Sequence, residues 1–407
     1  MNSFFRNNKM TLALLAGVLI GGACGVIFGD SVHVVKPVGD IFLNLVFMLV
    51  VPLVFFSIAS SLCKMSGTGM LGKVLGVTAA VFIAMSLVAG IITYLSTLVV
   101  NPLGNIDRSA LEGSLFDVSG AQKVATSEAI VNMVTVSDFN MLFTKSNLLP
   151  LIIFSALLGL AIPKAGEKGK HMASFLESGT EVTMQIMKYI MYLAPVGLGC
   201  FFADIIASVG PQILSGYIRV FLLYLAVAVI FFFGIHSVYA LMAGGREGLK
   251  LYWKNIMPPS LVALATTSSI AAIPGNIEAA KNMGVSEGIA ETVIPLGTNL
   301  HKDGSVVGGV MKVIFLMILC GQATTGVGVC FEAVLIAILS GVVIGAIPSG
   351  GLTGEILVCT LMGLDPQMAG IIIVIGTIVD MPASMLNSSA NVAAAMLINR
   401  FTSKKKD

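Results

Sequence analysis

The chain has 407 residues, of which 56% are hydrophobic and only 11% are charged, with a formal net charge of +2. A soluble domain carries about 25% charged residues, and a mean hydropathy of +0.96 leaves too little polar surface to cover a globule of this size. This composition excludes a soluble enzyme, a disordered protein and a coiled coil. Apolar stretches of about 20 residues recur along the chain, which predicts a multi-pass, all-α membrane protein.

The first apolar run covers residues 10–28 and follows Arg6 and Lys9. No small-x-small cleavage site with a polar mature domain follows it, so a signal peptide is disfavoured. Small residues repeat along the run at helical spacing: Gly17, Gly21, Gly22, Cys24 and Gly25. This spacing predicts a permanent first span with a tight helix-packing face.

Further apolar segments occupy residues 38–62, 74–100, 147–163, 184–208, 214–243, 305–320, 331–347 and 367–399. Lysine and arginine concentrate in alternate connections and beyond the last segment. The positive-inside rule then places both termini in the cytoplasm and the polar stretch 101–146 outside. Since no targeting peptide is recognisable, we expect a plasma membrane of the bacterial inner-membrane type.

Two apolar segments, 258–276 and 344–354, are interrupted by polar residues, glycine and proline. Pro274 and Pro348 cannot sit inside a regular helix without freeing a carbonyl group. A pair of such interrupted segments in corresponding parts of a chain is typical of the midplane site of a secondary transporter. The alternative is two proline-kinked helices that cross the membrane and pack through small residues.

Two carboxylates lie within apolar segments, where an ionised group is costly unless it serves a function. Asp303 follows Asn299, His301 and Lys302, a cluster that could also be a polar loop. Asp380 begins a polar stripe at helical spacing that continues through Ser384, Asn387 and Asn391. The stripe favours a lined pathway, and the alternative is hydrogen bonding between helices.

Several motifs together resemble one family, the dicarboxylate/amino acid:cation symporters, also called glutamate transporter homologues. They are Ala-Thr-Thr-Ser-Ser-Ile-Ala-Ala-Ile-Pro at 265–274, Lys-Asn-Met-Gly-Val-Ser-Glu-Gly at 281–288, Pro-Leu-Gly at 295–297 with Asp-Gly at 303–304, Ile-Pro-Ser-Gly-Gly at 347–351 and the stripe at 380–391. Weaker similarity at 191–197 and in the N-terminal spans extends the resemblance over nearly the whole chain.

The resemblance implies a homotrimer with eight transmembrane helices, two re-entrant hairpins and an elevator mechanism. Scaffold helices one and two would occupy residues 1–73, and scaffold helices four and five residues 147–210. The transport domain would comprise helix three at 74–100 and the whole of 211–407, with an extracellular loop at 101–146 between them.

The resemblance also implies the roles of individual residues at a substrate site. Asp380 matches the aspartate that pairs with the substrate amine, and Asn387 matches the asparagine that binds its α-carboxylate. Ser268 and Ser269 match serines at the first hairpin tip. The second tip, which acts as the gate, matches Pro348, Ser349, Gly350 and Gly351.

One departure concerns the substrate. Relatives that select aspartate or glutamate carry an arginine three residues after the amine-binding aspartate, where this chain has Ala383, followed by Ser384. A distal carboxylate would be buried there without its donors. We therefore expect cation-coupled symport of a small neutral amino acid such as serine, threonine or alanine. The alternatives are a dicarboxylate or acidic amino acid, or sodium-independent exchange.

The other departures concern the coupling cation. The asparagine-x-aspartate-glycine of the family reads His301-Lys302-Asp303-Gly304 here, and a further sodium-ligating aspartate is replaced by Asn391. Asp303 and Asn391 would thus be weak sodium ligands, with Gly297 beside them, and the segment 82–86 shows no clear copy of the helix-three ligands. We expect Lys302 to compensate the charge of Asp303 as a tethered cation.

His301 is then a candidate proton carrier, because imidazole titrates in the useful range. Alternatively, Lys302 reaches water and sodium coupling persists through backbone carbonyl groups. No cofactor is expected apart from Na⁺ as a possible coupling ion. The polar residues form one band, which disfavours a channel, and no protease motif is present, so we expect no enzyme.

Overall fold

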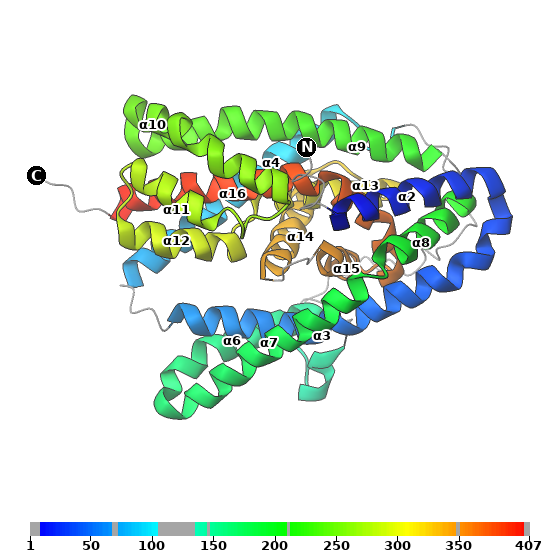
Figure 1. The fold of residues 1–407 in the computed structure, drawn as a ribbon, viewed down its shortest axis with the longest axis horizontal. Coiled ribbons are helices and arrows are strands. Elements are labelled where there is room, and N and C mark those ends of the chain that lie inside the picture. The colour runs from blue at the N-terminus through cyan, green and yellow to red at the C-terminus, as the bar shows by residue number, and fades with distance from the viewer. Residues whose placement is uncertain are drawn as a thin grey trace, which may run out of the picture.

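A computed structural model of the chain describes residues 9–66, 72–104, 135–144, 147–209, 212–346 and 351–402 (Figure 1). These residues are almost entirely helical, and no strand occurs among them, which confirms the predicted all-α class. Five stretches of this part of the chain are long and apolar enough to cross a bilayer: Ala16–Ser60, Gly76–Val99, Pro150–Met191, Ile213–Thr266 and Pro366–Thr402. The count of eight transmembrane helices stays a prediction.

One group of helices comes from the first half of the chain. It comprises α2 (Lys9–Phe28), the 3₁₀ segment η1 (Gly29–Val35), α3 (Lys36–Ser66), α6 (Leu148–Ala161), η6 (Ile162–Lys168), α7 (Gly169–Met191) and α8 (Ala194–Val209). Helix α3 contacts α6, α7 and α8, and α8 lies along α2. In Figure 1 these helices form the lower and right-hand parts of the molecule.

The contact between α2 and α8 depends on glycine. A Cβ atom at Gly17 would lie 2.2 Å from the carbonyl oxygen of Pro195, and one at Gly21 would lie 2.1 Å from that of Gly199. These distances are shorter than any van der Waals contact, so only glycine lets the two backbones approach this closely. The predicted packing face of the first apolar run is confirmed.

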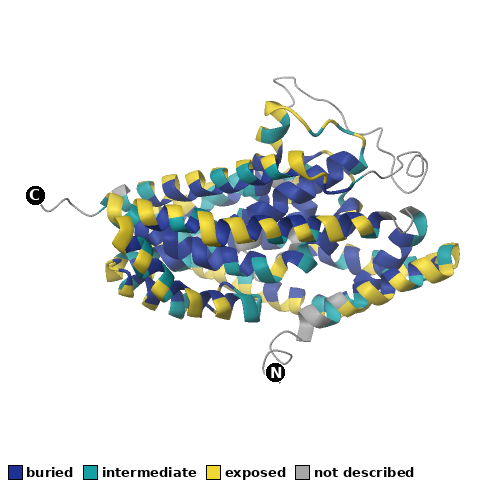
Figure 2. Cartoon of the chain, turned by 90° about the horizontal axis from the view of Figure 1, so that it is seen from above, coloured by how far each residue is buried: buried dark blue, intermediate teal, exposed yellow. Residues whose placement is uncertain are grey.

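A second group of helices surrounds α16 (Ala369–Thr402). It comprises α4 (Gly72–Val99), α9 (Gln212–Val229), the π-helical η7 (Ile230–Ile235), α10 (His236–Thr266), α11 (Ile273–Asn282), α12 (Glu287–Leu300), α13 (Asp303–Leu319), α14 (Val327–Ala346), α15 (Gly351–Leu361) and η8 (Pro366–Met368). Helix α16 contacts α4, α9, α10, α11, α12, α13 and α15. Every residue from 386 to 398 is buried, so α16 is the axis of the core (Figures 1 and 2).

The predicted interruption around residues 266–269 is confirmed. Helix α10 ends at Thr266, and Thr267 adopts a left-handed backbone conformation with a φ of 50°. Helix α11 begins at Ile273 with Pro274 in its first turn, where the missing N–H has no helical partner to lose. Gly245, with a φ of 63°, breaks α10 further back and separates the arm at 246–266 from the preceding span.

The chain is also interrupted at the predicted polar cluster. Helix α12 ends at Leu300 and α13 begins at Asp303, so His301 and Lys302 lie in non-helical backbone between two half-helices. The other predicted interruption falls between α14, whose described residues end at Ala346, and α15, which begins at Gly351. Pro348, Ser349 and Gly350 lie outside the described residues.

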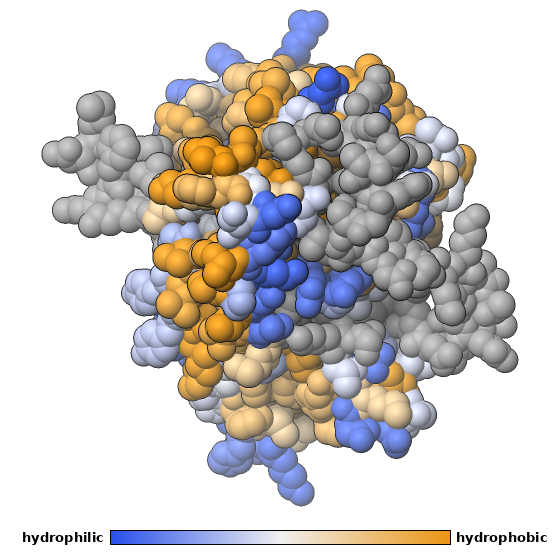
Figure 3. Space-filling view, turned by 90° about the vertical axis from the view of Figure 1, so that its right-hand side faces the viewer, coloured by the Kyte–Doolittle hydropathy of each residue, from blue (hydrophilic) through white to orange (hydrophobic). Residues whose placement is uncertain are grey.

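Large apolar side chains cover the outward faces of the helices, as a lipid environment requires. Examples are Leu19, which is 72% exposed, and Tyr189, which is 66% exposed. In the end-on view of Figure 3, hydrophilic side chains gather in the middle of the face with hydrophobic ones beside them.

Candidate functional site

The break between α12 and α13 holds a buried histidine against two other polar side chains. His301 Nδ1 is hydrogen-bonded to Asn391 Oδ1 of α16 at 2.9 Å. Its Nε2 lies 2.9 Å from Asp303 Oδ1, and the side chains of His301 and Asp303 are 0% and 1% exposed. The imidazole thus bridges the two residues that were predicted to be weak sodium ligands.

Helix α4 closes this cluster with two residues on one face. Phe82 stacks on the imidazole of His301, with ring centroids 4.6 Å apart and planes 7° from parallel. Ser86, one turn further on, donates a hydrogen bond of 3.1 Å to Asp303 Oδ1. Sequence reasoning found no helix-three ligand in this segment. The available signal was the spacing of a serine one helical turn after an aromatic residue.

The cluster retains unsatisfied polar atoms. Asp303 Oδ2 and Asn391 Nδ2 are buried and have no hydrogen-bond partner among the described residues. Asp303 also lies in the first turn of α13, where the helix dipole favours its negative charge. A buried carboxylate oxygen with a free lone pair can accept a proton or a hard cation.

Gly297 allows α12 to approach this cluster. A Cβ atom on Gly297 would lie 2.4 Å from Asn391 Oδ1 and 3.1 Å from the ring of Phe82. The structure therefore brings Gly297, His301, Asp303 and Asn391 together, and their role in cation coupling stays a prediction.

Lys302 does not compensate Asp303, contrary to the sequence-based expectation. Its Nζ donates a hydrogen bond of 2.9 Å to Ser269 Oγ at the tip after α10. Lys302 has non-helical backbone before the first turn of α13, with φ of −131° and ψ of 65°. In the described part of the chain no ion pair joins the two, and the ionisable side chain in contact with Asp303 is that of His301.

Asp380 differs from the rest of the polar stripe on α16. It is exposed, whereas Ala383, Ser384 and Asn387 are buried. Among the described residues, no side chain or backbone group is hydrogen-bonded or ion-paired with the Asp380 carboxylate. This carboxylate is therefore free to receive a cationic group.

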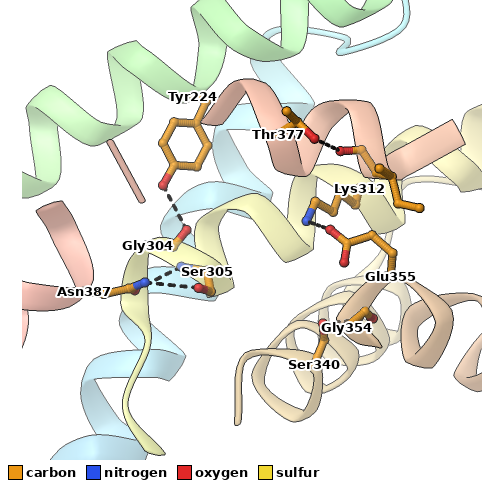
Figure 4. Close-up of polar contacts among 10 residues, drawn as sticks. Tyr224, Gly304, Ser305, Lys312, Ser340, Gly354, Glu355, Thr377 and Asn387 are labelled. Atoms are coloured by element: carbon orange, nitrogen blue, oxygen red, sulfur yellow. Dashed lines mark hydrogen bonds and ion pairs between the residues drawn. The ribbon is translucent and has the colours of Figure 1, made fainter. Parts of the chain in front are cut away.

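Asn387 fastens α16 to the start of α13. Its Oδ1 accepts a hydrogen bond from the backbone N–H of Ser305 at 3.2 Å, and its Nδ2 donates one to Ser305 Oγ at 3.1 Å (Figure 4). From the other side, the Tyr224 hydroxyl of α9 donates to the carbonyl oxygen of Gly304 at 2.9 Å. Of these groups, the N–H of Ser305 lies in the first turn of α13, where backbone donors have no acceptor within the helix.

The segment between α10 and α11, which is the predicted first hairpin tip, is held by contacts of its two serine side chains. Ser268 Oγ accepts a 3.3 Å hydrogen bond from the N–H of Ala271, and Ser269 is buried beneath Lys302. Asn276 of α11 donates to Ser388 of α16 at 2.8 Å, which ties this arm to the central helix. Of the predicted second tip only Gly351, the first residue of α15, is described.

The sequence analysis missed a buried ion pair. Lys312 of α13 is paired with Glu355 of α15, and their side chains are 8% and 1% exposed (Figure 4). Gly376 of α16 leaves room for the pair, because a Cβ atom there would lie 2.6 Å from Glu355 Oε1 and 3.2 Å from Lys312 Nζ. The signal was present in the sequence, since a lone lysine and a lone glutamate interrupt two apolar helices.

Comparison with known proteins matches residues 10–401 to the Sodium:dicarboxylate symporter family. The C4-dicarboxylate transport protein of Bacillus subtilis (strain 168) is 29% identical over 323 residues, which cover 77% of this chain and 74% of that protein. The proton/sodium-glutamate symport protein of Geobacillus stearothermophilus is 25% identical over 400 residues, which cover 95% and 93% of the two chains. With its apolar helices and broken helices around buried charges, this chain is a multi-pass membrane protein and a secondary transporter, not an enzyme, and it belongs to the sodium:dicarboxylate symporter family.

Proposed function

We propose that this transporter carries out cation-coupled symport of a small neutral amino acid such as serine, threonine or alanine. The observation that carries the proposal is the unpartnered, exposed carboxylate of Asp380 beside the buried Ala383. A carboxylate without a counter-ion suits the ammonium group of an amino acid. Ala383 offers no donor for a side-chain carboxylate, whose burial without partners costs several kcal/mol, on the order of 2–7.

The position of the Lys302 ammonium group favours a zwitterionic substrate. This group donates a hydrogen bond to Ser269 at the first hairpin tip. The family resemblance implies that the substrate carboxylate binds near this tip. An amino acid would then place its carboxylate at Lys302 and Ser269 and its ammonium at Asp380. The predicted contact of Asn387 with the carboxylate requires its amide to exchange Ser305 for the substrate.

A C4-dicarboxylate or an acidic amino acid is the second candidate substrate. The relatives named above are called C4-dicarboxylate and glutamate transporters, and the ammonium group of Lys302 can bind either end of a dicarboxylate. The free carboxylate of Asp380 would repel a ligand with two negative ends and no amine. The arrangement of charges therefore favours the amino acid.

The coupling cation acts, in this proposal, at the cluster of His301, Asp303 and Asn391. The free Asp303 Oδ2 suits either a proton or Na⁺, and the direct contact between imidazole and carboxylate supports a proton. The name of the Geobacillus relative includes both cations.

The arrangement of helices suggests how the proposed carrier would move. The helices around α16 would move as an elevator against the group formed by α2, α3, α6, α7 and α8, within a homotrimer. The proposal places it in the plasma membrane with both termini in the cytoplasm.

A thermal-shift and proteoliposome-uptake assay on the purified protein tests the substrate class. Serine, alanine, threonine, aspartate and succinate are compared with and without Na⁺ at an acidic and a neutral pH. Neutral amino acids should stabilise the wild type, and Asp380→Asn should abolish this response. Asp30→Asn, which removes an exposed carboxylate in η1, should preserve it. Stabilisation by succinate alone, or unchanged binding of serine by Asp380→Asn, would refute the proposal.

A further inference from the structure

The two groups of helices meet where α8 contacts the start of α16. Helix α8 belongs to the first group and also contacts α2 and α3, whereas α16 is the axis of the second group. Phe201 of α8 is 5% exposed and lies against Gly370, the second residue of α16. A Cβ atom on Gly370 would overlap Cε1 and Cζ of Phe201 and would lie 2.6 Å from its Cδ1. The aromatic ring therefore occupies a notch that only glycine leaves open.

The backbone of Phe201 is fixed against its own group of helices. It lies on Gly39 of α3, where an added Cβ atom would be 2.7 Å from Phe201 N and 2.8 Å from Phe201 Cα. Because these neighbouring atoms belong to the backbone, α8 has no space to retreat toward α3. The ring of Phe201 thus reaches from an anchored backbone in the first group to the notch in the second.

The notch is fixed in turn by the second group. The Tyr217 hydroxyl of α9 donates a hydrogen bond of 2.9 Å to the carbonyl oxygen of Ile371, the residue after Gly370. The Tyr217 ring also stacks on Phe315 of α13, with ring centroids 5.5 Å apart. Phe202, next to Phe201 on α8, contacts the same tyrosine with a centroid distance of 5.6 Å. The start of α16 is therefore tied to α9 and α13 at the place where α8 touches it.

Close packing decides which arrangement of these helices is preferred. Between apolar helices in lipid there is no hydrophobic driving force, so association depends on van der Waals contact and shape. The ring of Phe201 fits α16 in one register, because every other residue from Ala369 to Val374 carries a side chain. A movement of one group along the other must therefore take the ring out of the notch.

We propose that the contact between Phe201 and Gly370 is a latch, which stabilises the arrangement of the two groups seen in this structure and opens each time the groups move. The proposal rests on the proposed function, because it takes the elevator movement from it. It adds the contact that holds one end of that movement, and it gives Phe201 no contact with substrate or coupling cation.

A matched contact lies within the first group. Gly179 of α7 accommodates the ring of Phe56 of α3, and a Cβ atom there would lie 2.5 Å from both Cδ1 and Cε1 of that ring. In the proposal α3 and α7 do not move against each other. Gly179→Ala should therefore disturb the packing of a phenylalanine as Gly370→Ala does, without changing the balance between arrangements of the two groups.

The distance distribution between two spin labels measures this balance. The labels are attached at Tyr192→Cys beside the first group and at Val327→Cys in the second, positions that are 77% and 89% exposed. The six native cysteines are replaced by alanine. This labelled protein is compared in lipid nanodiscs, with and without serine, with its variants Gly370→Ala, Phe201→Leu, Gly370→Ala/Phe201→Leu and Gly179→Ala. Thermal unfolding of each variant is recorded in parallel.

Gly370→Ala overpacks only the arrangement seen here, so the population at the matching distance should fall at least about tenfold relative to other distances. Phe201→Leu should lower it too, and because this variant adds no atoms, it tests the latch even where Gly370→Ala fails to fold. The double variant should recover most of the population, since the methyl group at position 370 fills space that the ring leaves. Gly179→Ala should unfold at a lower temperature with unchanged distances.

Unchanged distances in Phe201→Leu or in a folded Gly370→Ala would overturn the latch, and so would an equal shift in Gly179→Ala. A balance that responds to Gly370→Ala but not to serine would support the latch and count against a neutral amino acid as substrate. One fixed distance in every variant, with and without serine, would refute the elevator movement and the latch with it.

Discussion

At the scale of single residues, the proposed cation site is assembled from four helices around one carboxylate. Asp303 receives a hydrogen bond from Ser86 of α4 and lies against His301, which in turn bonds Asn391 of α16. The glycine at position 297 is the only residue type that fits between these partners on α12. We therefore expect the proposed coupling site to be sensitive to a single added methyl group at Gly297.

Gly297→Ala should therefore weaken coupling without removing any charge. The new Cβ atom would lie 2.4 Å from Asn391 Oδ1, so the amide must move and lose its hydrogen bond to His301. We expect the cation dependence of uptake to shift by about tenfold, the equivalent of about 1.4 kcal/mol for one lost buried hydrogen bond. The measurement is uptake as a function of pH and of Na⁺ concentration.

Gly288→Ala is the matched control for this variant. It lies on the same helix α12, and a Cβ atom there meets nothing within 4 Å. Its uptake should follow the wild-type cation dependence. A Gly297→Ala variant that also follows it would show that the bond between Asn391 and His301 has no part in coupling.

At the scale of helices and segments, local sequence predicts the breaks but not the partners across them. The polar residues after Thr266 and the cluster at His301 interrupt apolar runs, and the helices end there. The contact between Ser86 and Asp303 joins residues 217 positions apart, and no local pattern specifies such a pairing. Lys302 is likewise hydrogen-bonded to Ser269, 33 positions away, and not to the neighbouring Asp303 with which the sequence predicts a pairing.

The first helix illustrates a packing pattern that sequence does predict. Small residues at helical spacing on α2 meet the backbone of α8, with a Cβ at Gly21 only 2.1 Å from the carbonyl oxygen of Gly199. Because that neighbour is backbone, it cannot move aside as a side chain can. Gly21→Ala should destabilise the protein by about 1–3 kcal/mol, as overpacking does.

Thermal unfolding in detergent measures the effect of Gly21→Ala. The control is Gly76→Ala on α4, where an added Cβ atom has no neighbour within 4 Å. Because alanine has a higher helix propensity than glycine, this control should be as stable as the wild type or slightly more stable. Equal melting temperatures for the two variants would mean that α2 and α8 separate freely.

At the scale of the whole molecule, the buried and site-facing charges around α16 nearly cancel. The carboxylates are Asp303, Asp380 and Glu355, and the ammonium groups are Lys302 and Lys312. Three negative and two positive groups leave one negative charge while His301 is neutral. A zwitterionic amino acid adds no net charge, so one coupled cation makes the loaded core neutral, which is the least costly state to move through a bilayer.

Uptake should accordingly carry one positive charge for each neutral amino acid. An inside-negative potential should accelerate it, because moving one elementary charge gains about 2.3 kcal/mol per 100 mV. The measurement is labelled-substrate uptake together with charge movement in proteoliposomes with an imposed potassium diffusion potential.

Asp303→Asn removes one negative charge, so its loaded core is neutral without a cation, and the variant should take up substrate independently of potential. Electroneutral uptake by wild type, or an Asp303→Asn variant as sensitive to potential as wild type, would contradict this balance of charges. The first result would mean that no net cation accompanies the substrate, and the second that the coupled cation is neutralised by a group other than Asp303.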